Sequence, residues 1–324
     1  MRVKNAVVAM LLWPVAVFAA DAPNGLQLLD KDVAYSIGIR APGPGGLETA
    51  LAEAEAAGPD SPRVAALLNI LGDQHRSQQR YAEAASTYQR SLDIFQRTMG
   101  AQHRNVASVS LTLADLHYAQ NRYAEAEPLY VRALAIFEQA LSADHPYVTT
   151  IVDNLAAIYR VQSRHADLEL LYQRSLAAAE KTLGPEHPRV VAIMNALSTH
   201  YQGQGRFAKA EPFAKRVLAT VEKVMGARHS NTGFAMSQLA GVYQAQARFA
   251  DAETLYKRSL AILEKELSPD HPVVGTVLNV FAALYEVQGR YADAEALLRR
   301  LSETRNLGVR LMGSGPVVLQ QRRR

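Results

Sequence analysis

The sequence predicts an all-α solenoid of stacked antiparallel helix pairs, and three observations support this prediction. Shifting the sequence by 42 residues superimposes its patterned part, from about Pro62 to about Glu303, without insertion or deletion. Each copy holds two runs of apolar residues at the three- and four-residue spacing of amphipathic helices. No run alternates with the two-residue period of a strand. A fixed period of this length indicates helix pairs that bury their apolar faces on one another.

Composition is that of an ordinary globular protein. The 324 residues are 48% hydrophobic and 20% charged, and the gapless register favours one continuous array over two domains. The formal net charge is +4, but Arg2, Lys4 and the run Arg322–Arg324 supply five positive charges at the two ends. The body between them is nearly neutral, so we expect no nucleic-acid partner. No cysteine is present, so packing alone must stabilise the fold.

Residues 1–20 have the pattern of a signal peptide. A positive start precedes the apolar run Ala6–Phe18, and Val17 and Ala19 place small residues at the −3 and −1 positions. We expect cleavage near Ala19 or Ala20 and export to the periplasm of a Gram-negative bacterium. An uncleaved anchor is the alternative, but the run is shorter than the roughly 20 residues that span a bilayer. The sequence therefore predicts no stable membrane anchor.

The remaining chain divides by the repeat. Residues 21–45 are irregular, residues 46–61 form a leading half-repeat with a cap helix, and residues 304–324 form a C-terminal cap and basic tail. The six repeat units between them span residues 62–103, 104–145, 146–187, 188–229, 230–271 and, in part, 272–303.

Each unit is predicted to be a helical hairpin. The first helix opens near a proline in four copies, because the first turn of a helix tolerates the missing N–H. The second helix starts after an arginine that recurs in all six copies. It ends at Gly100, Gly184 or Gly226, where glycine allows positive φ, or at Ser142 or Ser268.

Two short motifs occur inside the units: Leu155-Ala156 with Tyr159 in a first helix, and Ala126 with Tyr130 in a second helix. They match the two halves of one signature, and the units resemble a tetratricopeptide repeat of the 42-residue kinesin-light-chain-like type found in bacterial proteins. The phrases QGRYADAE, AEPLY, RALAI and SPDHP add to the resemblance. It implies a right-handed superhelical solenoid. Two copies depart from the pattern, with Leu168 in place of alanine and Ala214 in place of an aromatic residue.

Two ladders of repeated residues suggest chemistry at first sight. The histidines could suggest a metal site, but equivalent positions of stacked repeats lie on the order of 10 Å apart, too far to share one ion. The arginines could suggest phosphate binding, but presence in every copy favours a structural role at the end of the first helix. We predict structural roles for both ladders: His103, His145, His187, His229 and His271; Arg80, Arg122, Arg164, Arg206, Arg248 and Arg290.

No catalytic constellation is recognisable. The sequence has no cysteine nucleophile, Gly-x-Ser-x-Gly, P-loop or dinucleotide fingerprint. We predict that carboxylates of the second helices, such as Glu125 and Glu127, lie on solvated faces of these helices. We therefore expect no enzyme activity, no catalytic residue, no cofactor and no metal.

Function is expected where the copies differ. The family resemblance implies that the first helices line a concave groove that binds a peptide segment or a partner helix, with asparagine side chains bonding the ligand backbone. The predicted function is thus a protein-interaction scaffold or adaptor. The candidate groove residues are Asn69, Asp73, Arg76, Leu111, Asp115, Tyr118, Asp153, Arg160, Asn195, Thr199, Gln202 and Asn279.

Other interpretations of the sequence remain open. The variable positions could be an ordinary solvated face. The array could also self-associate into a structural assembly, because solenoids with imperfect caps can stack end to end. Finally, Arg322–Arg324 could touch anionic lipid and make the chain a membrane-surface regulatory module, at about 1 kcal/mol for each charge.

Overall fold

The computed structural model describes residues 46–313, with side chains described through residue 302. These residues form thirteen helices and no strand, which confirms the all-α prediction. The predicted signal peptide, the irregular segment 21–45 and the basic tail from residue 314 lie outside the described residues. Within residues 46–313, no helix is both long enough and apolar enough to cross a membrane.

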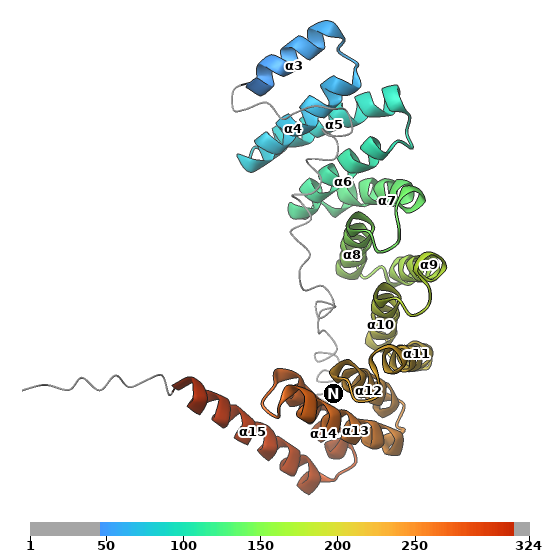
Figure 1. The fold of residues 1–324 in the computed structure, drawn as a ribbon, viewed down its shortest axis with the longest axis vertical. Coiled ribbons are helices and arrows are strands. Elements are labelled where there is room, and N and C mark those ends of the chain that lie inside the picture. Colours follow the sequence, from blue (N-terminus) through green and yellow to red (C-terminus); the bar gives the residue numbers. More distant parts are fainter. Residues whose placement is uncertain (1–45, 314–324) are drawn as a thin grey trace, which may run out of the picture. The chain divides into compact units, whose positions relative to one another are not determined.

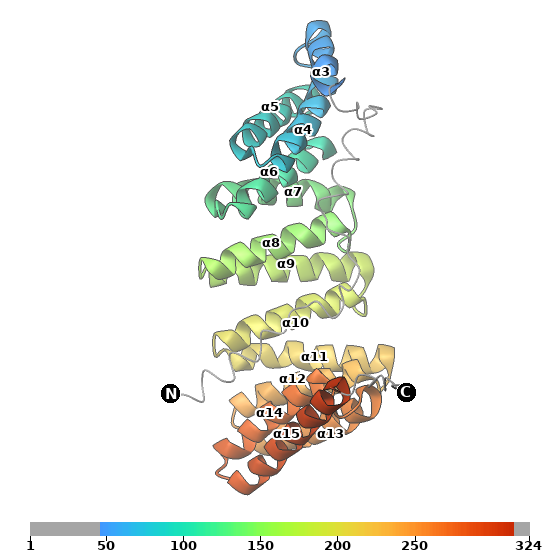
Figure 2. The ribbon, with the colours of Figure 1, turned by 90° about the vertical axis from the view of Figure 1, so that its left-hand side faces the viewer.

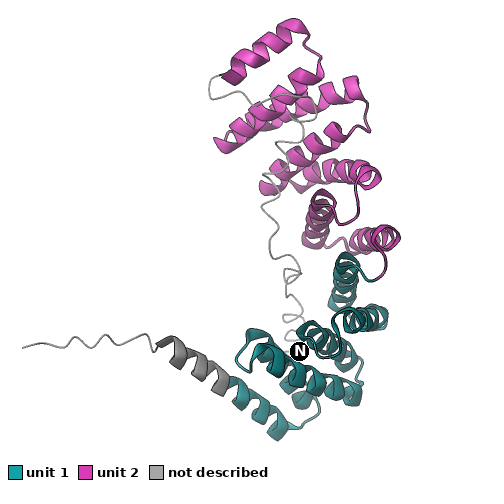
Figure 3. Cartoon of the chain, viewed as in Figure 1, with its two compact units in different colours: residues 1–18, 186–324 teal, residues 19–185 magenta. Residues whose placement is uncertain are grey.

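The described chain separates into two compact units between Pro185 and Glu186 (Figure 3). We call residues 46–185 the N-unit and residues 186–313 the C-unit. The N-unit contains α3 (Gly46–Ala57), α4 (Pro62–Ser77), α5 (Tyr81–Met99), α6 (Arg104–Ala119), α7 (Tyr123–Ala140), α8 (Pro146–Val161) and α9 (His165–Leu183). The C-unit contains α10 (Pro188–Gly203), α11 (Phe207–Met225), α12 (Ser230–Ala245), α13 (Phe249–Leu267), α14 (Pro272–Val287) and α15 (Tyr291–Gly313).

Each unit is a stack of helical hairpins, one from each 42-residue copy. In the N-unit, the first helices α4, α6 and α8 follow one side of the stack and the second helices follow the other (Figures 1 and 2). In the C-unit, α10, α12 and α14 are the first helices. The leading helix α3 precedes α4, where the sequence predicted a half-repeat with a cap helix.

The first helices begin with a side-chain cap. Ser61 Oγ accepts a hydrogen bond from the backbone N–H of Val64 at 3.3 Å. In the five later copies, a histidine Nδ1 accepts from the N–H two residues on, at 3.1–3.2 Å. These bonds satisfy N–H groups that the first helical turn leaves unpaired. The structural role predicted for the repeated histidines is therefore confirmed.

The turn inside each hairpin contains one left-handed residue directly before the repeated arginine. Its φ lies between 56° and 73° in the residues Gln79, Asn121, Ser163, Gly205, Ala247 and Gly289. The next N–H, that of the arginine, donates to the carbonyl five residues back at 2.8–2.9 Å. This bond closes the first helix in the manner of a Schellman motif. The sequence predicted that the second helix starts after this arginine, but it did not predict the left-handed residue before it.

The second helices end mostly as predicted. Gly100, Gly184 and Gly226 have φ of 85–95°, and Ser268 takes the same conformation with φ 93° and ψ 152°. In the second copy α7 ends instead at Ala140, and the following residue is extended, with φ −127°. That copy therefore uses no left-handed residue at this turn.

Tyrosines of the second helices fill the core of the hairpins. Tyr88, Tyr130 and Tyr256 are at most 1% exposed. The Tyr88 ring lies so close to Gly72 that a Cβ there would fall 2.5 Å from its Cε1 atom. Small residues at this position therefore let the second helix insert its ring against the first helix.

The fourth copy compensates for its missing aromatic residue. Ala214 replaces the core tyrosine and is 3% exposed, while the preceding Phe213 stacks on Tyr201 of the first helix at 5.9 Å. The aromatic contact has moved by one position along the second helix. In the third copy, the unexpected Leu168 is buried in the core, at 1% exposure.

Candidate functional site

The candidate residues divide between the two units. Eight lie on α4, α6 and α8 of the N-unit, and four lie on α10 and α14 of the C-unit. Asp153 and Arg160 are exposed, and Asn69, Leu111 and Gln202 are buried. The half-buried members are Asp73, Arg76, Asp115, Tyr118, Asn195, Thr199 and Asn279.

The three buried members correct the expectation of a uniformly exposed stripe. Asn69 is 2% exposed, Leu111 1% and Gln202 5%. Gln202 Nε2 also donates a hydrogen bond to Ser198 Oγ at 3.2 Å, and Ser198 in turn donates to the carbonyl of Ala210. Ser198 thus makes the bond that joins α10 to α11, and Gln202 supports the Ser198 hydroxyl from within α10. None of these three side chains presents a surface to a partner.

Asp115 belongs to a half-buried hydrogen-bond network that joins three helices of the N-unit. The Tyr130 hydroxyl of α7 donates to Asp115 Oδ1 at 2.6 Å. Asn154 Nδ2 of α8 donates to the Tyr130 hydroxyl at 2.9 Å and approaches Asp115 Oδ1 at 3.4 Å. Burial raises the pKa of Asp115 to about 6, although the bond from Tyr130 and the charge of Arg76 act in the opposite direction.

The first copy repeats part of this arrangement. The Tyr88 hydroxyl donates to Asp73 Oδ1, and Arg76 pairs with the same carboxylate at 3.1 Å. In both copies the aspartate precedes its tyrosine by fifteen residues, a spacing that could have identified the pair from the sequence. These aspartates therefore anchor core tyrosines, a role that the sequence reasoning missed.

Arg160 differs from its counterpart in the first copy. Arg76 has Asp73 one turn earlier, whereas Ala157 occupies that position before Arg160. Arg160 Nε donates to the carbonyl of Ala156 in its own helix at 3.2 Å. Among the described residues, no carboxylate pairs with it. Burial raises the pKa of Tyr118, and the positive charge of Arg160 acts in the opposite direction.

The C-unit face is uncharged at its candidate positions. Asn195 and Thr199 lie on α10 and Asn279 lies on α14, all half-buried. None of the three side chains forms a hydrogen bond with another described residue. Their polar groups thus remain open to solvent or to a ligand.

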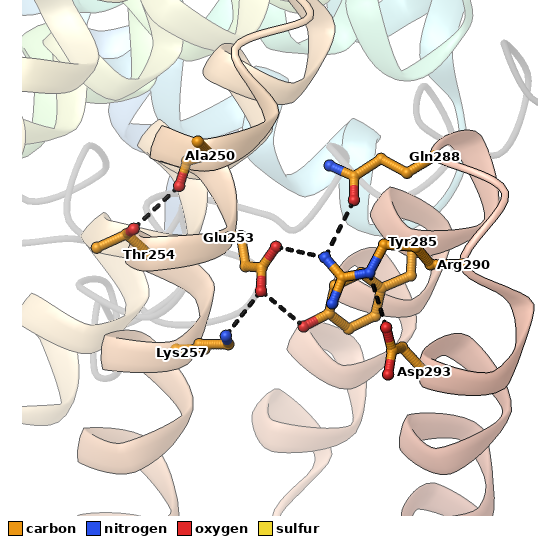
Figure 4. Close-up of polar contacts among 8 residues, drawn as sticks. All are labelled: Ala250, Glu253, Thr254, Lys257, Tyr285, Gln288, Arg290 and Asp293. Atoms are coloured by element: carbon orange, nitrogen blue, oxygen red, sulfur yellow. Dashed lines mark hydrogen bonds and ion pairs between the residues drawn. The ribbon is translucent and has the colours of Figure 1, made fainter.

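In three copies, the repeated arginine is a structural clamp between successive hairpins. Arg290 Nε donates to Asp293 at 2.7 Å, Nη1 donates to Glu253 at 2.7 Å, and the guanidinium lies 4.1 Å from the centroid of the Tyr285 ring (Figure 4). Lys257 and the Tyr285 hydroxyl also bond Glu253. Such charge-assisted and cation–π contacts fix the orientation of the side chain. Arg290 therefore has a structural role, as predicted for the ladder.

Equivalent clamps occur at two other junctions. Arg164 pairs with Glu127 in the N-unit, and Arg248 pairs with Glu211 at 3.0 Å in the C-unit. The prediction that Glu127 belongs to a solvated face is therefore wrong, because its side chain is 21% exposed and is held by Arg164. Sequence reasoning missed these pairs, which are 37 residues apart.

No metal centre is found in the part of the chain that the structure describes. There, no group of three or more histidine, aspartate or glutamate side chains is arranged to hold an ion. The repeated histidines instead act singly, each at the start of its own helix.

Comparisons with known proteins agree with this architecture. A tetratricopeptide repeat model matches residues 63–139, 147–223 and 231–306, whereas no curated protein matches the chain. The chain is similar to the crystal structure of BtubC (BKLC) from P. vanneervenii, with 21% identity and a TM-score of 0.52 over 75% of this chain and 95% of that one. It is also similar to a putative kinesin light chain from Podosopora anserina with nearly identical TPR-like repeats, with 25% identity and a TM-score of 0.51 over 63% of this chain and 96% of that one.

Proposed function

The chain belongs to the tetratricopeptide repeat family, and we propose that it is a non-catalytic scaffold that binds a protein partner. The residues that recur in every copy are used for caps, clamps and core packing, as described above. What remains for function are exposed or half-exposed positions of the first helices that vary between copies. Stacked hairpins hold such positions in a fixed array, so little conformational entropy is lost when a partner binds.

We place the partner contact on α8 of the N-unit, at Asp153 and Arg160. Both side chains are exposed, and seven residues of helix separate them by about 10 Å. The observation that carries the proposal is the lack of a carboxylate for Arg160, which its counterpart Arg76 has. A partner segment that brings an acidic side chain or a terminal carboxylate would supply the missing charge.

Charge reversal on α8 tests this proposal. The variant Arg160→Glu is compared with Arg132→Glu, an exposed arginine on the second helix α7 of the same unit. Purified protein is used to capture partners from the source cell by crosslinking, followed by mass spectrometry. We expect Arg160→Glu to lose a partner that the wild type and Arg132→Glu both retain. Identical sets of captured proteins for all three would remove α8 from the interaction surface.

We further propose that the chain is exported after removal of residues 1–20. This proposal rests on the charged start, the apolar run and the small residues before Ala20. Trp13 is the only tryptophan of the chain, so the mature protein should show tyrosine emission alone. Tryptophan emission from protein isolated outside the cytoplasm would show that the segment is retained.

A further inference from the structure

The α8–α9 hairpin lacks a buried hydrogen bond that joins the two helices in other copies. In the first copy, Ser91 Oγ of α5 donates to the carbonyl of Ala65 in α4 at 2.6 Å. In the fifth copy, Ser259 Oγ of α13 donates to the carbonyl of Gly233 in α12, also at 2.6 Å. Ser175 holds this position in α9 and is 7% exposed, yet its hydroxyl has no hydrogen-bond partner among the described residues. The third copy therefore buries a hydroxyl at a cost that the first and fifth copies avoid.

The third copy also has an unusual residue where its two helices meet. The Ser198 hydroxyl of α10 donates to the carbonyl of Ala210 in α11 at 3.3 Å, so these two positions touch in the fourth copy. The equivalent positions of the third copy are Ala156 and Leu168. In the five other copies the second-helix residue is an alanine that is at most 3% exposed: Ala84, Ala126, Ala210, Ala252 and Ala294.

The bulk of Leu168 accounts for the missing bond. A buried leucine at a contact built for alanine separates the two helices, because protein interiors are close-packed. Ser175 lies seven residues after Leu168, about two helical turns, and therefore on the same side of α9. In agreement, α8 and α9 pack less closely along their length than α4 with α5 or α6 with α7. The Ser175 hydroxyl is thus out of reach of the first helix.

The second hairpin holds both helices of the third. Asn154 of α8 donates to the Tyr130 hydroxyl of α7 at 2.9 Å, and Arg174 of α9 donates to Glu138 of α7. These bonds position α8 and α9 against the same neighbour. The third hairpin can therefore stay open without a side-chain bond between its own helices at Ser175.

We propose that Leu168 is a wedge that holds the α8–α9 hairpin open, and that the hairpin closes when this side chain is shortened. In the closed form, the Ser175 hydroxyl donates to the carbonyl of Thr149, which holds the position of Ala65 and Gly233 in the first and fifth copies. The third hairpin is thus a conformational element of the N-unit, whose open form depends on one side chain. Its opening sets where the exposed face of α8 lies. The proposal does not depend on the partner site on α8.

A double-mutant cycle of Leu168→Ala and Ser175→Ala tests the proposal by urea unfolding of the full-length protein. Leu92→Ala and Ser91→Ala in the first hairpin are the matched controls. Leu92 is 1% exposed in α5, as Leu168 is in α9, and Ser91 forms the hydrogen bond that Ser175 lacks.

We expect Leu168→Ala to keep or raise the urea midpoint, whereas Leu92→Ala should lower it, as loss of a buried leucine normally does. Ser175→Ala should not lower the midpoint of the wild type, because no hydrogen bond is lost. In the Leu168→Ala background it should lower the midpoint, as Ser91→Ala does in the wild type.

Two results would overturn the proposal. If Leu168→Ala lowers the midpoint as far as Leu92→Ala, Leu168 is an ordinary core residue and not a wedge. If Ser175→Ala has the same effect with and without Leu168→Ala, the hairpin has not closed onto the Ser175 hydroxyl.

Discussion

Asp115 should make the stability of the N-unit fall as pH rises through the acidic range. Its pKa is about 6 in the folded protein against an ordinary value of 3.8, because the carboxyl group is buried beside Tyr130 and Asn154. Between these values the folded state keeps a proton that the unfolded state has lost. Stability therefore decreases from pH 4 upward and levels off above pH 6.

The size of this effect follows from the shift. At 1.36 kcal/mol per pKa unit, about two units correspond to about 3 kcal/mol. The variant Asp115→Asn keeps an oxygen that can accept from Tyr130 but removes the buried charge. We expect Asp115→Asn to match the wild type near pH 4 and to exceed its stability by about 3 kcal/mol near pH 7.5.

Urea unfolding of both proteins at the two pH values measures the difference directly. All other side chains are the same in both proteins, so their contributions cancel in the comparison. If the gap between Asp115→Asn and the wild type is the same at both pH values, the buried carboxyl is not the source of the pH dependence.

Three further substitutions probe the caps and clamps by urea unfolding. Ser268→Gly should stabilise the C-unit by about 1 kcal/mol, because φ 93° with ψ 152° is a conformation that favours glycine. A loss of stability would show that the backbone of Ser268 is not strained. His103→Ala should cost about 1 kcal/mol by removing the acceptor for the Asn105 N–H, while His103→Ser should restore most of it; equal losses would argue against a cap. Glu253→Gln should cost about 1 kcal/mol at neutral pH, since the carboxylate holds the Arg290 guanidinium. The hydrogen bond from Lys257, and after it the one from Arg290, lowers the pKa of Glu253. The Glu253 carboxylate therefore stabilises the folded state at neutral pH, and this stabilisation is lost as pH falls. If the free energy of unfolding of Glu253→Gln decreases toward acidic pH as much as that of the wild type, this reasoning is refuted.

The repeat made the fold predictable from the sequence. Helix starts near prolines, a turn that ends at a repeated arginine and helix ends at glycines all follow from local chemistry that is copied every 42 residues. The histidine caps could also be anticipated, because a residue repeated in register at a helix start has a local partner. Those parts depend on neighbours within a few residues.

The candidate site was harder to predict because burial depends on helices that are distant in sequence. Position in the repeat placed Leu111 and Asp153 on equivalent helix faces, yet the first is buried and the second exposed. The partners of Asp115 lie 15 and 39 residues away on two other helices. A periodic pattern gives the register of a helix face but not what packs against it.

The clamp that joins successive hairpins also decides which part of the N-unit unfolds first. In the first copy, Ala85 occupies the position of the clamp glutamates Glu127, Glu211 and Glu253. The arginine of the next copy, Arg122, therefore has no clamp partner there, and among the described residues it pairs only with Glu125 of its own helix. In a linear stack each hairpin is held only by its neighbours, so the weakest junction decides where cooperativity breaks. The α4–α5 hairpin should thus open before the rest of the N-unit, which native-state hydrogen exchange would detect as earlier exchange of its amides than those of α6–α8.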